Sequence, residues 1–194
     1  SRVDLDSFFM QGNPEENLSG ILSATEDKVR NPFLLMFDEY LTPKIPWNDY
    51  RVVGLSIIHI GQVIPGLTLA RQLRQRYPHL HIVIGGSVFN RHADLLDDKQ
   101  ELFKQFFHSL IVSEGEQPLD QLLSHLKENK PLNTVPNLIY LEENKVIRNP
   151  KSEALPYDQL VCPTFDQLPL EKYLMPYPVS VSYTHLTLPT TPYV

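Results

Sequence analysis

Residues 51–62 read Arg-Val-Val-Gly-Leu-Ser-Ile-Ile-His-Ile-Gly-Gln, and no other stretch says as much about the architecture of this chain. The first half is apolar and β-branched without alternation, which is typical of a strand that helices bury on both faces. Ser56, His59 and Gln62 then collect toward the end of the stretch. Because ligands of open α/β sheets bind beyond the carboxyl ends of the strands, these polar residues predict one edge of a binding site.

Two later segments repeat this design, each a short apolar run that ends in a glycine turn. Residues 81–87 read His-Ile-Val-Ile-Gly-Gly-Ser, and residues 110–116 read Leu-Ile-Val-Ser-Glu-Gly-Glu. Residues 64–77 lie between the first two runs and carry the apolar periodicity of an amphipathic helix. A strand, a helix and a strand in close succession predict a parallel sheet with a right-handed crossover.

The region after the third run predicts a helix and a hairpin. Residues 118–127 form an amphipathic pattern that is expected to bury Leu119, Leu122, Leu123 and Leu126. Residues 137–141 and 145–148 flank Glu-Glu-Asn and predict two antiparallel strands. The sequence therefore predicts an α/β fold, with a parallel sheet, flanking helices and a C-terminal β-hairpin.

Composition narrows the classes of function. The 194 residues, 42% of them hydrophobic, can bury one good core. The net charge of −6, without a cluster of Lys and Arg, argues against a nucleic-acid partner. No apolar run is long enough to span a membrane, and the single cysteine, Cys162, fits a reducing cytoplasm. A cytoplasmic protein without a membrane partner is expected.

Each polar feature at the strand ends has two interpretations. Residues 85–87 can offer backbone amides to a ligand, or they can form an ordinary tight turn. Residues 114–116 can bind ligand hydroxyls or amides, or they can be the acidic start of a helix. His59 can bind a metal or carry a proton, although a histidine at a strand end more often makes an ordinary hydrogen bond. The residues show no catalytic constellation and no metal-binding spacing, so on physical grounds they predict an α/β binding module.

The ordered series of motifs over residues 31–179 resembles the amino-terminal cobalamin (B12)-binding domain of cobalamin-dependent radical SAM proteins. No single motif is specific, whereas their order and spacing are. The matching segments are Val53-Gly-Leu-Ser-Ile with Gln62, Leu69-Ala-Arg, Ile84-Gly-Gly-Ser, Ser113-Glu-Gly-Glu with Leu119, Val135-Pro-Asn-Leu-Ile-Tyr, Phe165-Asp-Gln-Leu-Pro-Leu-Glu-Lys-Tyr and Pro176-Tyr-Pro-Val.

The resemblance implies a flavodoxin-like, Rossmann-like sheet with the corrin over the strand ends and the nucleotide tail near the glycine turn. It implies no cobalt ligand here, because the Asp-x-His-x-x-Gly motif that supplies a lower-axial histidine in related domains is missing, so His59 is not expected to bind cobalt. By position, the cofactor-binding residues are Ser56, Ile58, His59, Gln62, Gly85, Gly86, Ser87, Ser113, Glu114, Gly115 and Glu116.

The resemblance also implies a division of the chain. Residues 1–30 form a polar segment. Residues 31–132 form the cobalamin-binding-like domain, incomplete because a strand usual in the family has no match before Asn31. Residues 133–179 form the hairpin and a linker toward a radical SAM domain. Residues 180–194, rich in Thr and Pro, resemble translated sequencing-adapter sequence and are expected to be non-native.

In the family, cysteines that follow the Pro-x-Pro-Val segment hold the 4Fe-4S iron–sulfur cluster that cleaves S-adenosyl-L-methionine. The resemblance therefore implies that this fragment is not itself catalytic. It would present cobalamin to the radical SAM domain of the same parent chain, for methyl transfer or a radical rearrangement. One alternative is a non-enzymatic α/β ligand-binding or interaction module that has lost cobalamin binding, or a nucleotide-binding remnant. Another is a glycosyltransferase half-domain, which would also use glycine turns at strand ends.

Overall fold

The computed structural model describes residues 2–3, 8–153, 155–156, 164–166, 168–169 and 172. The chain divides into two compact units, Ser1–Ala154 and Leu155–Val194. The fold described below is that of the first unit. The expected non-native tail at residues 180–194 lies outside the described residues.

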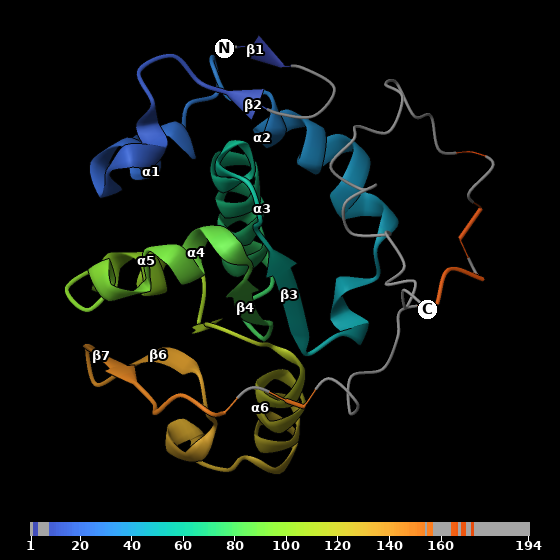
Figure 1. The fold of residues 1–194 in the computed structure, drawn as a ribbon. Coiled ribbons are helices and arrows are strands. Elements are labelled where there is room, and N and C mark those ends of the chain that lie inside the picture. The colour runs from blue at the N-terminus through green and yellow to red at the C-terminus, as the bar shows by residue number, and fades with distance from the viewer. Residues whose placement is uncertain are drawn as a thin grey trace, which may run out of the picture. The chain divides into compact units, whose positions relative to one another are not determined.

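A five-stranded sheet forms the centre of the first unit, and its strands lie in the order in which they occur in the sequence. β3, β4 and β5 are parallel, whereas β6 is antiparallel to β5 and β7 is antiparallel to β6. The predicted α/β fold with a terminal hairpin is confirmed, in the arrangement of a Rossmann-like domain (Figure 1). The strands are β3 (Val52–Ser56), β4 (His81–Gly85), β5 (Ser109–Ile111), β6 (Leu138–Glu142) and β7 (Lys145–Arg148).

Helices connect these strands and cover both faces of the sheet. Figure 1 shows α4 and α5 on one side of the sheet and α6 on the other. The helices of this part are α3 (Val63–Arg76) between β3 and β4, α4 (Ser87–Arg91) and α5 (Gln100–Gln105) between β4 and β5, and α6 (Glu116–Glu128) between β5 and β6. Within the described residues, no helix is long and apolar enough to cross a membrane.

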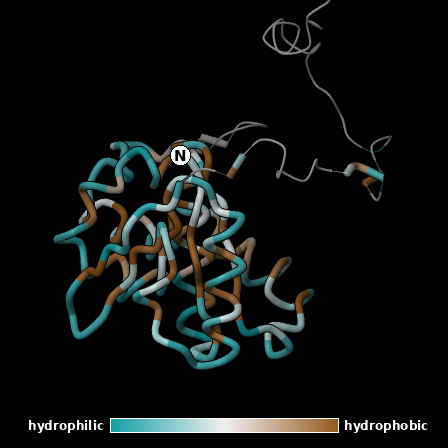
Figure 2. The backbone as a smooth tube through the Cα atoms, turned by 60° about the horizontal axis from the view of Figure 1, so that its bottom comes forward, coloured by the Kyte–Doolittle hydropathy of each residue, from teal (hydrophilic) through white to brown (hydrophobic). Residues whose placement is uncertain are grey.

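The apolar runs at residues 82–84 of β4 and 110–111 of β5 do not alternate with polar residues, because both faces of these strands are buried. Ile82, Ile84 and Leu110 pack in one core cluster with residues of α3 and α5. Val83 and Ile111 alternate with them and pack in a second cluster beneath α6. We call these the first and second faces of the sheet. Hydrophobic stretches accordingly run through the interior of the unit, and hydrophilic ones follow its outer loops (Figure 2).

The N-terminal residues pack on the first core cluster, to which Met10, Ile21 and Ala24 contribute. Arg71 of α3 donates to the carbonyl oxygen of Leu22 at 3.1 Å and so holds the end of α1. The short elements of this region are β1 (Arg2–Val3) paired with β2 (Phe8–Phe9), α1 (Leu18–Ala24), α2 (Phe33–Met36) and a π-helical turn at Phe37–Leu41.

The prediction for the leucines of α6 is wrong in part. Leu122 is fully buried, but Leu119 is 39% exposed and Leu123 is 43% exposed. Leu122 packs α6 into the second core cluster, and of β3 only the partly buried Val52 packs against this cluster. Leu119 and Leu123 lie outside it on an exposed flank of α6, although the periodicity of the helix is that of a buried one.

Candidate functional site

A hollow of about 460 Å³ lies on the second face of the sheet, where β3, β4 and β5 end. Parallel strands bring their carboxyl ends to one edge, so segments that are far apart in the sequence meet there. We call this concavity the strand-end hollow. Six of the predicted site residues line it, namely Ser56, Gly85, Gly86, Ser113, Gly115 and Glu116.

The floor of the hollow is bare backbone on two neighbouring strands. Gly54 and Gly85 both line it, and a Cβ on Gly54 would meet only the Val83 side chain, at 3.9 Å. A Cβ on Gly85 would lie 3.8 Å from the carbonyl oxygen of Ile111. Nothing therefore fills the space over these two glycines. Gly54 is not among the site residues predicted from the sequence, although a glycine inside a strand often marks close approach by another group.

Ser113 occupies the rim in a strained conformation. Its φ of 61° is in the left-handed region, where residues other than glycine are uncommon. The Asn90 side chain stabilises this turn, because its Oδ1 accepts from the Ser113 backbone N–H at 3.0 Å. The hydroxyls of Ser56 and Ser113 have no hydrogen-bond partner among the described residues, so both can bind a ligand.

Gly86 is required by the fold. Its φ is +105°, and a Cβ there would lie 2.3 Å from the carbonyl oxygen of Ile57. The chain beyond β3 runs directly against this turn, since Ile57 N–H donates to the Gly85 carbonyl at 2.8 Å and Val88 N–H donates to the Ile57 carbonyl at 3.3 Å. The close approach at Gly86 is thus made by the protein's own backbone, which favours the tight-turn interpretation.

The side chains of Ile58, His59 and Gln62 do not line the hollow. Gln62 Oε1 accepts from the N–H groups of Ile58 and His59 at 2.9 and 3.2 Å, and His59 Nδ1 accepts from Gly61 N–H at 3.2 Å. Ser87 Oγ donates to the Ile58 carbonyl at 2.8 Å. These polar atoms hold the turn between β3 and α3, so their contact with a ligand stays a prediction.

Glu114 and Glu116 make the rim acidic. Both residues are exposed, and Glu116 lies in the first turn of α6. The Glu114 carbonyl oxygen accepts from Asn137 Nδ2 at 3.3 Å, which fixes the rim loop to the start of the hairpin. Glu114 does not line the hollow, and its contact with a ligand stays a prediction. Among the described residues, no group of three or more His, Cys, Asp or Glu side chains is placed to hold a metal ion.

No family model and no curated protein matches this sequence. Two solved structures similar to the chain are of the radical S-adenosylmethionine methyltransferase TsrM from Kitasatospora setae. One holds a tryptophan substrate and a SAM analog, and the other holds cobalamin and a [4Fe-4S] cluster. The identities are 16% and 17%, over 75% and 77% of this chain, and both TM-scores are 0.41. The chain spans 28% of the length of that protein.

Proposed function

We propose that the chain is a cobalamin-binding domain and that the strand-end hollow receives the nucleotide tail of the cofactor. The observation that carries this proposal is the bare floor formed by Gly54 and Gly85 at the ends of adjacent parallel strands. A flat, uncharged base can lie against backbone only where side chains are missing. The hollow of about 460 Å³ is in the size range of small-molecule sites.

The residues around the floor suit such a tail chemically. Val83, Ile111 and Leu119 provide apolar walls for a base, and the Ser56 and Ser113 hydroxyls can bond the sugar or phosphate. The corrin is larger than the hollow and would lie outside it. Ile58, 62% exposed and two residues beyond Ser56, offers apolar surface there. When bound, cobalamin supplies a cobalt centre that can carry a methyl group, and this chain's residues contribute binding and orientation.

The acidic rim separates this proposal from a nucleotide site. Glu114 and Glu116 repel a ligand that carries several phosphates, and the cobalamin tail carries a single phosphodiester. The sequence also lacks the three-glycine dinucleotide fingerprint and the P-loop lysine. A non-enzymatic module that binds a free nucleotide is therefore the less favoured alternative. For the parent protein, the same proposal includes a radical SAM domain that holds the iron–sulfur cluster.

The test fills the floor without disturbing the fold. Gly54→Leu places a side chain in the hollow at a position where an added Cβ would meet no backbone atom within 4 Å. Equilibrium dialysis of the full chain with hydroxocobalamin should show affinity at least about tenfold lower for this variant. Lys145→Leu is the matched control, because it adds an exposed leucine to β7, away from the hollow.

Thermal unfolding of both variants shows that a loss of affinity is not a loss of folded protein. Equal cobalamin affinity in Gly54→Leu and in the unaltered chain would place the ligand elsewhere. Failure of the unaltered chain to bind hydroxocobalamin, together with saturable binding of AMP, would favour the nucleotide alternative.

A further inference from the structure

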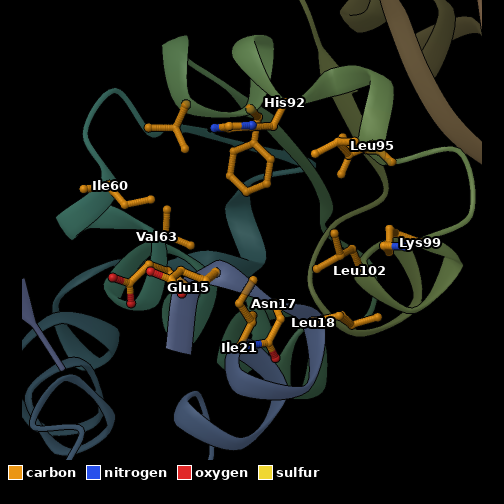
Figure 3. A pocket seen from close by; sticks show the side chains of 14 residues that line it. Glu15, Asn17, Leu18, Ile21, Ile60, Val63, His92, Leu95, Lys99 and Leu102 are labelled. Atoms are coloured by element: carbon orange, nitrogen blue, oxygen red, sulfur yellow. The ribbon is translucent and has the colours of Figure 1, made fainter. Parts of the chain in front are cut away.

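A second cavity, of about 410 Å³, lies on the first face of the sheet and shares no lining residue with the strand-end hollow. Side chains from residues 15–21, the start of α3, α4 and α5 surround it. Figure 3 shows Leu18 and Ile21 closing it from one side and His92 and Leu95 from the other. The sheet separates it from the strand-end hollow, because Val63 and Leu102 pack in the first-face cluster, whereas Val83 and Ile111 pack in the second.

The walls of this cavity are mainly apolar. Leu18, Ile21, Val63 and Leu102 line it, and Leu95 and Ile60 at its mouth are 65% and 40% exposed. Because contact between such side chains and water is unfavourable, the entry of an apolar molecule into the cavity is favourable. The volume corresponds to a compact small molecule.

The charged side chains of the lining stand at the rim. Figure 3 shows Glu15 and Lys99 on opposite sides of the cavity, and Glu16 also lines it. The Lys99 ammonium is already paired with Asp98 Oδ1 at 2.6 Å. Glu15 and Glu16 would repel an anion, and a cation would have to leave water for mainly apolar walls, so the cavity favours an uncharged ligand.

His92 supplies a directional polar group. Figure 3 shows its imidazole projecting over the cavity from the end of α4. No hydrogen bond joins its ring nitrogens to another of the described residues. A neutral imidazole presents one donor and one acceptor, so it can bond a ligand hydroxyl or N–H and fix its orientation.

We propose that this cavity is a second binding site, for a compact, uncharged and mostly apolar molecule with one hydrogen-bonding group that meets His92. The site does not depend on the proposed cobalamin function. Its ligand is recognised by apolar contact over most of its surface and by the imidazole at one end.

The test compares two probes that differ in one hydroxyl, naphthalene and 2-naphthol. Titrations followed by NMR shifts of the full chain should show saturable binding of both, with 2-naphthol about threefold to tenfold tighter. His92→Phe keeps an aromatic ring and removes the polar atoms. It should abolish the preference for 2-naphthol while naphthalene binding persists.

Val88→Phe adds volume to the cavity wall on α4 and should abolish binding of both probes. Leu18→Phe does the same from the opposite wall and replaces the first variant if that variant fails to fold. Leu35→Phe is the control, since Leu35 is 62% exposed on α2 and is not a lining residue. Cobalamin affinity measured on the same variants should stay unchanged.

Lack of saturable 2-naphthol binding by the unaltered chain would overturn the proposal. So would binding that survives both blocking variants, or a preference for 2-naphthol that persists in His92→Phe.

Discussion

Gly54 and Gly86 lack side chains for opposite physical reasons. At Gly54 an added Cβ would be in ordinary contact with Val83, in a conformation that any residue adopts. At Gly86 the φ of +105° and the Ile57 backbone both exclude a side chain. The first glycine leaves space for a ligand, and the second allows two segments of the protein to approach each other.

We expect Gly86→Ala to lower the free energy of unfolding by at least about 2 kcal/mol, because it combines backbone strain with a steric clash. Gly54→Val should leave stability unchanged or raise it by about 0.5–1 kcal/mol, since glycine inside a strand costs conformational entropy. Urea unfolding of the two variants measures both values. Equal stability losses would show that Gly54, too, is held by the fold.

His81 and His108 form a half-buried pair at the amino-terminal end of the parallel strands. Their rings stack with centroids 5.0 Å apart, and His81 Nε2 lies 2.8 Å from Ser109 Oγ. Burial, and secondarily the Arg74 guanidinium, lowers the pKa of His81 to about 4. Burial, Arg74 and His81 lower the pKa of His108 to about 3. Both imidazoles are therefore neutral in the folded protein at neutral pH.

This pair makes the fold sensitive to acid. The folded pKa values lie below the unfolded value of 6.5, so the unfolded state binds more protons once the pH drops below 6.5. Stability is fully present above pH 6.5 and is lost as the pH falls toward 4 and then 3. Each histidine contributes a slope of at most about 1.4 kcal/mol per pH unit.

The double variant His81→Gln/His108→Asn removes both titrating groups. Asn at 108 retains an acceptor for the Ile82 N–H, which His108 Nδ1 binds at 2.9 Å. Urea unfolding between pH 7.5 and 4 should show a smaller decrease in stability for this variant than for the unaltered chain. Parallel pH profiles for the two proteins would mean that other groups cause the acid sensitivity.

Two neighbouring leucines of α6 contribute very differently to stability. Leu122 is completely buried in the second core cluster, whereas Leu123 is 43% exposed on the uncovered flank. Leu122→Ala should lower the free energy of unfolding by about 2–5 kcal/mol, because it leaves a cavity. Leu123→Ala should cost less than about 1 kcal/mol. Two equal and large losses, measured by urea unfolding, would show that the flank is covered in solution.

β3 is the free edge of the five-stranded sheet. It pairs with β4 over five positions, and no described strand pairs with its other side. Gly54 and Ser56 of β3 line the strand-end hollow together with Leu119 of α6, so the hollow lies beside this free edge. The placement of the candidate ligand site thus depends on which elements cover the sheet.

The whole first unit should fold without the residues that follow it. Among the described residues, every buried member of the two core clusters lies between Met10 and Tyr140. The hairpin is tied by Asn149 Nδ2, which donates to the carbonyls of Leu132 and Val135 at 2.7 Å. A chain that ends at residue 154 should therefore melt at the same temperature as the full chain, within about 2 °C. A large drop in the melting temperature, or loss of cooperative unfolding, would show that later residues stabilise this unit.

The sequence was sufficient to predict the order of strands and helices and six residues of the strand-end hollow. A β-branched run that ends in glycine specifies a strand and its turn locally, and parallel pairing necessarily brings such turns to one edge. Ser56, Gly85 and Ser113 could be placed together for this reason. The predicted hairpin followed from equally local signals, two short strands around a polar turn.

Tertiary packing alone decided the rest, because exposure depends on neighbours that lie far away in the sequence. The apolar period of α6 is the same for Leu119 as for Leu122, yet only Leu122 packs in the second core cluster, and Leu119 is left 39% exposed at the strand-end hollow. In the same way, Gly86 was placed at the site by its turn, but its function follows from the Ile57 backbone that packs against it. The cavity beside His92 could not be predicted from the sequence, because its walls come from segments between residues 15 and 102 that meet only in the folded chain.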